Sequence, residues 1–105
     1  MKLVIANDHA AVDLKFAILE HLKERGIEVV NIGTDTKERY QYPLAGYRAA
    51  KMVANGEADG GVLICGTGIG ISLAANKVKG IRAAVCSEPY SAKMAREHNN
   101  ANMIA

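Results

Sequence analysis

The sequence predicts an α/β fold of the Rossmann-like type, a three-layer sandwich in which a parallel sheet of about five strands lies between helices. Short apolar runs alternate with amphipathic stretches from end to end, which is the order typical of strands joined by crossover helices. No linker, internal repeat or low-complexity segment divides them. Domains cluster at about 100 to 150 residues, so we expect one domain over residues 1–105.

The first half of the chain contains two predicted strands and two predicted helices. Residues 2–6 form an apolar run that predicts a buried strand, and residues 27–32 form a second one that ends at Gly33. Between them, residues 11–25 have helical spacing, and Gly26 supplies a left-handed stop. The apolar face of this helix is expected to hold Ala11, Leu14, Ile18 and Leu22, and the polar face Asp13, Lys15, Glu20, Lys23 and Glu24. Residues 34–41 are polar and predict a surface loop, after which Pro43 suits the first turn of a helix to about Ala54.

The second half repeats the alternation. Residues 61–65 predict a third strand, and residues 66–70 a tight glycine loop that opens a helix through Lys77. Residues 82–86 predict a fourth strand, Pro89 begins a helix toward His98, and residues 102–105 begin a fifth strand. Ligands of such sheets bind beyond the carboxyl ends of the strands. The expected site therefore includes residues 7–9, 33–42, 65–70 and 86–89.

Composition excludes several classes of partner. The 13 Lys and Arg are interspersed with 11 Asp and Glu, without a basic block, so nothing selects nucleic acid or an anionic membrane. No apolar run approaches the roughly 20 residues of a membrane helix, and the first run is too short for a signal peptide. The two cysteines lie in apolar stretches and are interpreted as reduced thiols. We therefore expect a cytoplasmic protein.

The segment from Cys65 to Gly70 carries the strongest chemical signal. A buried strand runs into three alternate glycines, Gly66, Gly68 and Gly70, and then into a helix. Glycines let the backbone turn sharply and direct its N–H groups into one concavity, which suits an anion. The spacing fits neither the dinucleotide fingerprint nor a P-loop. A glycine turn that serves only strand-to-helix packing is an equally open reading.

Cys65 stands immediately before this glycine turn. A thiol at that position can be activated as a base or a nucleophile, although a cysteine on a strand is more often a small buried hydrophobe. Cys86 has no glycine cradle after it and is interpreted as an ordinary buried thiol.

Two polar pairs follow elements of the predicted sheet. Asp8 and His9 follow the first strand, and His98 and Asn99 follow the last helix, so we expect both pairs at one edge. A carboxylate, imidazoles and a carboxamide around an anion cradle suit proton transfer on a polyhydroxylated anion. Two alternative roles stay open. Asp8 can cap the first helix, and His98 can interact with the dipole at the C-terminus of its helix. The third histidine, His21, is expected to be surface or packing.

Other chemistries have weaker signals. A zinc site needs closely spaced Cys and His ligands, and only His9 has another candidate ligand, Asp8, beside it. A nucleophile elbow at Ser72 is also weak, because Ser72 falls inside the predicted helix rather than at the turn.

The motifs in order resemble the sugar-phosphate isomerase family that includes ribose-5-phosphate isomerase B and the galactose-6-phosphate and allose-6-phosphate isomerases. The resemblance covers the whole chain, and residues 60–77 are its most specific part. It rests on Asn7-Asp8-His9, Tyr42-Pro43, the run from Gly60 to Ser72 with Ala74, Asn76 and Lys77, Gly80 to Ala84, Glu97-His98-Asn99 and Asn102.

The resemblance implies catalytic roles for three residues. Cys65 is similar to the base that moves a proton between C2 and C1 of the open-chain sugar. Thr67 is similar to the neighbour that orients the substrate or the thiolate. His98 is similar to the residue that opens the furanose ring.

It also implies a set of substrate contacts. Asp8 resembles the contact to sugar hydroxyls, His9 a phosphate ligand and Asn99 a ligand of sugar oxygens. Tyr42 occupies the position of a tyrosine at the family's site. The implied anion hole for the enediolate consists of the amides of Gly66 to Gly70 and Ser72, that is, of Gly66, Gly68, Ile69, Gly70 and Ser72 with their neighbours.

The implied activity is the interconversion of ribose 5-phosphate and ribulose 5-phosphate, a reaction of the pentose phosphate pathway, with a small-molecule sugar phosphate as partner. No metal and no redox cofactor are implied. The family forms homodimers or dimers of dimers with shared active sites. Isomerisation of a hexose 6-phosphate is the alternative reaction.

The chain departs from the family at three places. Ala10 stands where the family commonly has glycine, and Gln41 where it has aspartate. Family members also continue past residue 105 into a C-terminal helix, with arginines that bind phosphate, so the chain is expected to be C-terminally truncated. His9 and Arg39 are then the remaining phosphate partners. The alternative to an active isomerase is a chain that binds a sugar phosphate but catalyses poorly, or one that supplies half of a site completed by another polypeptide.

Overall fold

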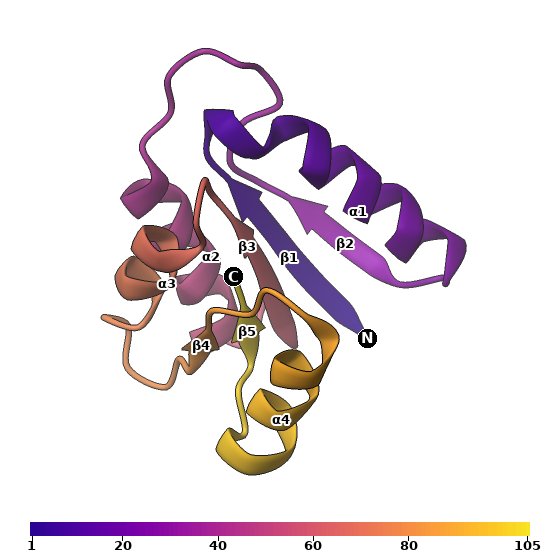
Figure 1. Ribbon diagram of the computed structural model, residues 1–105, viewed down its shortest axis with the longest axis vertical. Coiled ribbons are helices and arrows are strands. Elements are labelled where there is room, and N and C mark those ends of the chain that lie inside the picture. Colours follow the sequence, from indigo (N-terminus) through magenta and orange to yellow (C-terminus); the bar gives the residue numbers. More distant parts are fainter.

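The computed structural model describes all 105 residues as one parallel sheet with helices on both faces (Figure 1). The strands lie in the order β2-β1-β3-β5-β4, and every neighbouring pair is parallel. This arrangement confirms the predicted α/β class and the expected number of strands. The strands are β1 (Lys2–Asn7), β2 (Glu28–Asn31), β3 (Gly60–Ile64), β4 (Ala83–Ala84) and β5 (Met103–Ile104).

Two helical layers cover the sheet. The larger core cluster joins Val4 and Leu63 of the sheet to Ala49 and Ile71 of α2 and α3. The smaller cluster joins Ile5 and Ile64 to the segment leading into α1, and residues of α4 lie near Val62 on that same face. The helices are α1 (Val12–Glu24), α2 (Tyr42–Ala54), α3 (Ile69–Ala75) and α4 (Pro89–Asn99), with a short 3-10 turn at His9–Ala11.

Local signals set most helix boundaries. Gly26 follows α1 with a φ of +71°, a left-handed conformation that glycine adopts without steric cost. Pro43 and Pro89 lie in the first turns of α2 and α4, where the missing N–H costs nothing. Gly46 lets α2 approach α3, because a Cβ there would lie 2.7 Å from the carbonyl oxygen of Ile71.

The inward face of α1 differs from the expected one. Leu14, expected on the apolar face, is 54% exposed, whereas Lys15, expected on the polar face, is completely buried. Val12 is buried and Ile18 is half-buried, so Lys15 lies on their stripe at helical spacing. The sequence interpretation assigned these two residues by polarity, and the structure reverses both.

The C-terminal strands are shorter than expected. Residues 82–86 were predicted as a strand, but only Ala83–Ala84 is one. The side chain of Asn76 flanks it, accepting from the Ala83 amide at 2.8 Å and donating to the Ala83 carbonyl at 2.9 Å. A side-chain amide thus replaces the backbone partner that an edge strand lacks.

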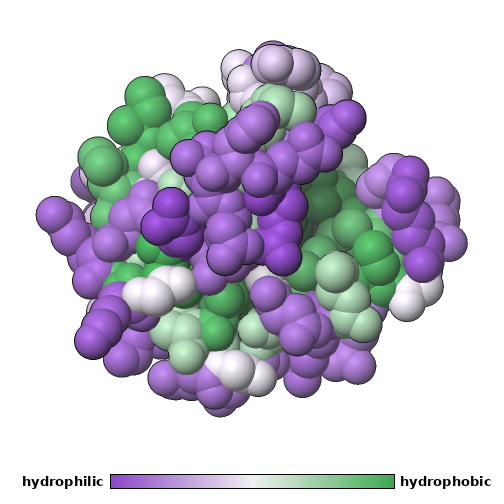
Figure 2. Space-filling view, turned by 90° about the horizontal axis from the view of Figure 1, so that it is seen from below, coloured by the Kyte–Doolittle hydropathy of each residue, from purple (hydrophilic) through white to green (hydrophobic).

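An apolar hollow lies near the amino ends of the strands. It has a volume of about 260 Å³ and is lined by residues of β1, β3, β5 and α4, among them Leu3, Val62, Ala92 and Ile104. Figure 2 looks at this end of the molecule and shows apolar surface recessed between hydrophilic groups. None of the helices has the length and hydrophobicity needed to cross a bilayer.

Candidate functional site

A second hollow lies at the carboxyl ends of β1 and β3. Its volume is about 260 Å³, and the residues that line it are Asp8, Tyr42, Cys65, Gly66, Thr67 and Gly70. Three of the four segments expected at this edge contribute to it, and residues 86–89 do not. We call this hollow the cleft.

The pairing of β1 with β3 brings Asp8 to Cys65. Asn7 and Ile64 are partners at the end of the ladder, and the Asp8 amide donates to the Ile64 carbonyl at 3.1 Å. Asp8 Oδ1 accepts from the Ala10 amide at 2.9 Å, so the residue does cap the 3-10 turn. The other carboxylate oxygen has no bond within the chain and is accessible, so capping leaves it available to a ligand.

The glycine loop wraps around the Cys65 sulfur. Gly68 has a left-handed φ of +80°, and its amide donates to Cys65 Sγ at 3.2 Å. Thr67 Oγ1 accepts from the Ile69 amide at 3.2 Å, which stiffens the turn. The Cys65 sulfur therefore faces one backbone N–H donor of the loop.

Not all amides of this loop are available to an anion. Those of Gly66, Thr67 and Gly70 donate to no group of the chain. The amides of Gly68 and Ile69 already donate to Cys65 Sγ and Thr67 Oγ1. Fewer amides of the loop are therefore free to bind an anion than the sequence predicted.

Ser72 does not fit its expected role. Its amide donates to the Gly68 carbonyl at 3.2 Å, and its hydroxyl donates to the Ile69 carbonyl at 2.8 Å. The residue is 3% exposed. The first turn of α3 thus uses the donors of Ser72 internally, and the expectation of a free donor there is wrong.

Tyr42 closes one side of the cleft. It begins α2, and its ring lies so close to Gly70 that a Cβ at Gly70 would overlap the ring atoms. Glycine at position 70 is therefore required for this contact between α2 and α3.

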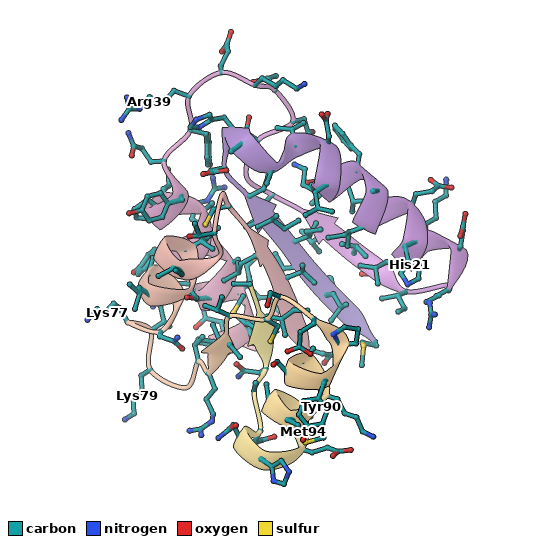
Figure 3. The ribbon with its side chains drawn as sticks, viewed as in Figure 1. His21, Arg39, Lys77, Lys79, Tyr90 and Met94 are labelled. Carbon is teal, nitrogen blue, oxygen red and sulfur yellow. The ribbon has the colours of Figure 1, made fainter.

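The loop before Tyr42 holds the expected phosphate partners. His9 Nδ1 lies 3.1 Å from the Tyr40 amide nitrogen and 3.4 Å from the Tyr40 carbonyl oxygen, so the backbone of Tyr40 holds the imidazole ring in place. Arg39 lies on the outer part of this loop and extends away from the body of the molecule (Figure 3). His21 is exposed near the end of α1, as expected for a surface residue.

His98 and Asn99 lie at the opposite edge of the sheet. Asn99 ends α4, and its carbonyl accepts from Arg82 Nε at 2.5 Å, beside the start of β4. Figure 1 shows α4 ending away from the carboxyl ends of β1 and β3. The expectation that both polar pairs share one edge is wrong within a single chain, because a crossover helix returns to the amino ends of the strands.

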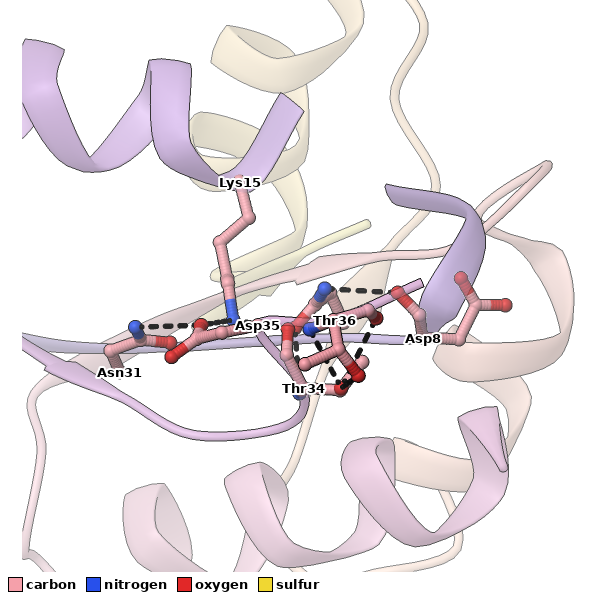
Figure 4. A network of polar contacts seen from close by, with 7 residues as sticks. Asp8, Lys15, Asn31, Thr34, Asp35 and Thr36 are labelled. Atoms are coloured by element: carbon pink, nitrogen blue, oxygen red, sulfur yellow. Dashed lines mark hydrogen bonds and ion pairs between the residues drawn. The ribbon is translucent and has the colours of Figure 1, made fainter. Parts of the chain in front are cut away.

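Two polar residues of this region have structural roles that the sequence interpretation did not assign to them. Asn7 is completely buried and links the loop after β2 to Asp8. Lys15 donates to Asp35 Oδ1 at 2.5 Å and to the Thr34 carbonyl at 2.6 Å (Figure 4). The sequence signal for the role of Asn7 was a polar residue at the last position of an otherwise apolar strand.

The other cysteine and the acidic and histidine side chains do not form a second candidate site. Burial, with a smaller contribution from Glu88, raises the pKa of the Cys86 thiol, in keeping with its interpretation as an ordinary cysteine. No group of three or more His, Cys, Asp or Glu side chains is arranged to hold a metal ion.

Comparisons with known proteins agree on one family. The family described as Ribose/Galactose Isomerase matches residues 3–105. The chain is 55% identical over 104 residues to ribose-5-phosphate isomerase B of Escherichia coli, covering 99% of this chain and 70% of that protein. It is 50% identical over 105 residues to galactose-6-phosphate isomerase subunit LacB of Clostridium acetobutylicum, covering 100% of this chain and 61% of that protein.

A solved structure gives the same result. Ribose-5-phosphate isomerase B of Clostridium thermocellum superposes with a TM-score of 0.98 at 53% identity, covering 100% of this chain and 71% of that one.

The Lys15–Asp35 contact predicts a pH dependence of stability. The hydrogen bond from Lys15 lowers the pKa of Asp35 below its ordinary value of 3.8, with a smaller effect of Asn31. Because the folded pKa is the lower one, the contribution is present above the unfolded value and is lost as the pH falls through the folded pKa. The difference in unfolding free energy between wild type and Asp35→Asn should therefore shrink from pH 7 to pH 2.5, measured by urea denaturation.

Glu38→Gln, an exposed carboxylate of the same loop, serves as the control and should show no such trend. A wild-type to Asp35→Asn difference that stays constant over this pH range would contradict the assignment.

Proposed function

Because the chain belongs to the ribose/galactose isomerase family of sugar-phosphate isomerases, we propose that it interconverts ribose 5-phosphate and ribulose 5-phosphate by proton transfer through an enediolate. The observation that carries this proposal is the content of the cleft. The residues that carry one thiol, one accessible carboxylate oxygen and three unpartnered amides line the same hollow.

The proposed chemistry needs a base and a stabiliser of negative charge. The Cys65 thiolate removes the proton from C2 of the open-chain aldose, and the electron pair of that bond forms the C1–C2 double bond. The aldehyde oxygen then carries the negative charge, within reach of the amides of Gly66, Thr67 and Gly70. Return of the proton to C1, with loss of the proton from the C2 hydroxyl and protonation of O1, yields the ketose.

Substrate binding falls to the other wall of the cleft. The free oxygen of Asp8 is an acceptor for sugar hydroxyls, and the ring of Tyr42 limits the width of the cleft. The imidazole of His9, held through Nδ1 by the backbone of Tyr40, offers Nε2 as a partner for phosphate. Thr67 lies beside Cys65 and orients the substrate or the thiolate.

Ring opening and part of the sugar contacts are assigned to His98 and Asn99 of a second copy of the chain. One chain holds these residues at the edge opposite to its own cleft, so they can serve only the cleft of another copy. Exposed apolar residues on the helices that flank the cleft support an interface there, since such patches mark contacts between proteins. They are Leu44 and Tyr47 of α2 and Ile69 and Leu73 of α3.

A hexose 6-phosphate is the second candidate substrate. The 50% identity to a galactose-6-phosphate isomerase subunit favours it, and the chemistry would be the same. A sugar-phosphate binding protein without turnover is the candidate from a different functional class, since the chain spans 70% of the length of the Escherichia coli relative.

Replacing Cys65 by alanine should abolish isomerisation. Removing a general base lowers kcat by about 100-fold to 10,000-fold, whereas KM should change little because the binding groups remain. The measurement is steady-state turnover of the 5-phosphate of ribose and of the 6-phosphates of allose and galactose. Cys86→Ala is the matched control and should keep wild-type turnover.

Full turnover by the Cys65→Ala chain would overturn the mechanism. Preference of the wild-type chain for a hexose phosphate would select the second substrate, and calorimetric binding without turnover would select the binding module.

Mixing two inactive variants tests the shared site. A Cys65→Ala chain and a His98→Ala chain each lack one group, but their mixed dimer contains one cleft with both groups intact. Random exchange should restore about a quarter of wild-type activity, since half of the dimers are mixed and each has one complete cleft. Absence of recovery, with mixed dimers verified by native mass spectrometry, would contradict the shared site.

A further inference from the structure

Lys15 is a buried charge that the proposed chemistry does not use. Its side chain is 0% exposed, although it lies on a surface helix. A buried ammonium is costly unless it is paired and hydrogen-bonded. The partners of Lys15 therefore indicate what this residue holds in place.

Those partners belong to the turn that follows β2. Lys15 Nζ donates to the Thr34 carbonyl at 2.6 Å and to Asp35 Oδ1 at 2.5 Å. Asp35 also accepts from Asn31 Nδ2 at 3.2 Å, and its side chain is 58% exposed. The amine thus ties α1 to residues 34–35 from the inside of the molecule (Figure 4).

The same turn is bonded to the segment that carries Asp8. The Thr34 amide donates to Asn7 Oδ1 at 3.2 Å, and Asn7 Nδ2 donates to the Asp8 carbonyl at 2.9 Å. Gly33 makes this approach possible, because a Cβ there would lie 2.7 Å from Asn7 Oδ1. Asn7 is itself completely buried, so its amide has no alternative partner in solvent.

The far end of the loop is attached to the same segment. The Tyr40 amide donates to His9 Nδ1 at 3.1 Å, and Tyr42 follows at the cleft. Residues 33–42 are therefore fixed at one end through Lys15 and Asn7 and at the other through His9. Asp8 and Tyr42 are the two cleft residues within reach of these anchors.

We propose that Lys15 is a positioning residue for the substrate-binding wall of the cleft: its amine holds the turn at Thr34 and Asp35, which sets Asn7, Asp8 and the loop leading to Tyr42. The inference rests on the proposed function for its kinetic consequence. Cys65 and the unpartnered amides belong to the segment after β3, which none of these hydrogen bonds contacts. Disturbing Lys15 thus weakens sugar binding and leaves proton transfer largely intact.

The test uses two variants and two matched controls in the full 105-residue chain. Lys15→Met removes the amine and keeps the length of the side chain, with Lys23→Met as its control on the exposed face of α1. Asp35→Ala removes the acceptor at an exposed position, with Glu38→Ala as its control in the same loop. In Asp35→Ala the Lys15 amine keeps one partner, the Thr34 carbonyl, so this variant weakens the contact by a second route that leaves Lys15 in place.

Two readouts separate positioning from general stability. Amide hydrogen exchange of Ala10, Thr34 and Tyr40, followed by NMR, should accelerate about 10-fold to 100-fold in both variants, the effect of losing a hydrogen bond to a charged group. KM for ribose 5-phosphate should rise about 10-fold while kcat changes less than about 3-fold, which corresponds to loss of binding common to substrate and transition state. The control variants should match wild type in both.

Wild-type exchange rates at these three amides in Asp35→Ala would overturn the proposal, and so would a fall in kcat at constant KM. A wild-type chain that neither binds nor converts any sugar phosphate would instead refute the proposed function. In that case the exchange rates of Ala10 and Tyr40 still decide whether Lys15 positions the wall.

Discussion

The parallel pairing of β1 with β3 is the constraint on which the candidate site depends. Its register sets Asn7 opposite Ile64, and the Asp8 amide extends the ladder by one bond to the Ile64 carbonyl. Both strands are buried among apolar side chains on two faces, so a slip by one residue would move every side chain of the strand to the opposite core cluster. Because the register cannot slip, the polar segment after β1 and the glycine loop after β3 leave the sheet side by side, and Asp8 and Cys65 meet in one cleft.

The two walls of this cleft are built differently. The wall after β3 is backbone: a left-handed glycine at position 68 curls the chain so that one amide meets the Cys65 sulfur while three others stay free. The wall after β1 is made of side chains, and a network that runs from Lys15 through the turn at Thr34 to Asn7 supports it. Glycine at position 70 joins the walls, since the ring of Tyr42 rests where any larger residue would have its Cβ. Because one wall is backbone and the other is held by side chains, we infer that substitutions in the Lys15 network alter substrate binding more than proton transfer.

Most of the fold was predictable from local patterns, and the errors have physical causes. Apolar runs and their glycine or proline boundaries located the strands and helices, because those residues act through the backbone within a few positions. Lys15 and Leu14 were assigned to the wrong faces of α1, since polarity does not reveal that a buried turn offers acceptors to an amine. Ser72 was expected to offer a free amide, but the first turn of α3 uses it internally. His98 was placed at the cleft although a crossover helix runs antiparallel to the strands and ends at their amino edge. Predicting Lys15 and Asn7 required the tertiary contacts of the loop after β2.

The cleft at the carboxyl ends of β1 and β3 is the proposed binding site of the sugar phosphate. This assignment can be tested by titrating the ¹⁵N-labelled 105-residue chain with ribose 5-phosphate and following the amide chemical shifts. We expect the largest shifts at the unpartnered amides of Gly66, Thr67 and Gly70 and at the segment from Asp8 to Ala10. Shifts confined to the apolar hollow near Leu3 and Val62, with the loop after β3 unchanged, would contradict it.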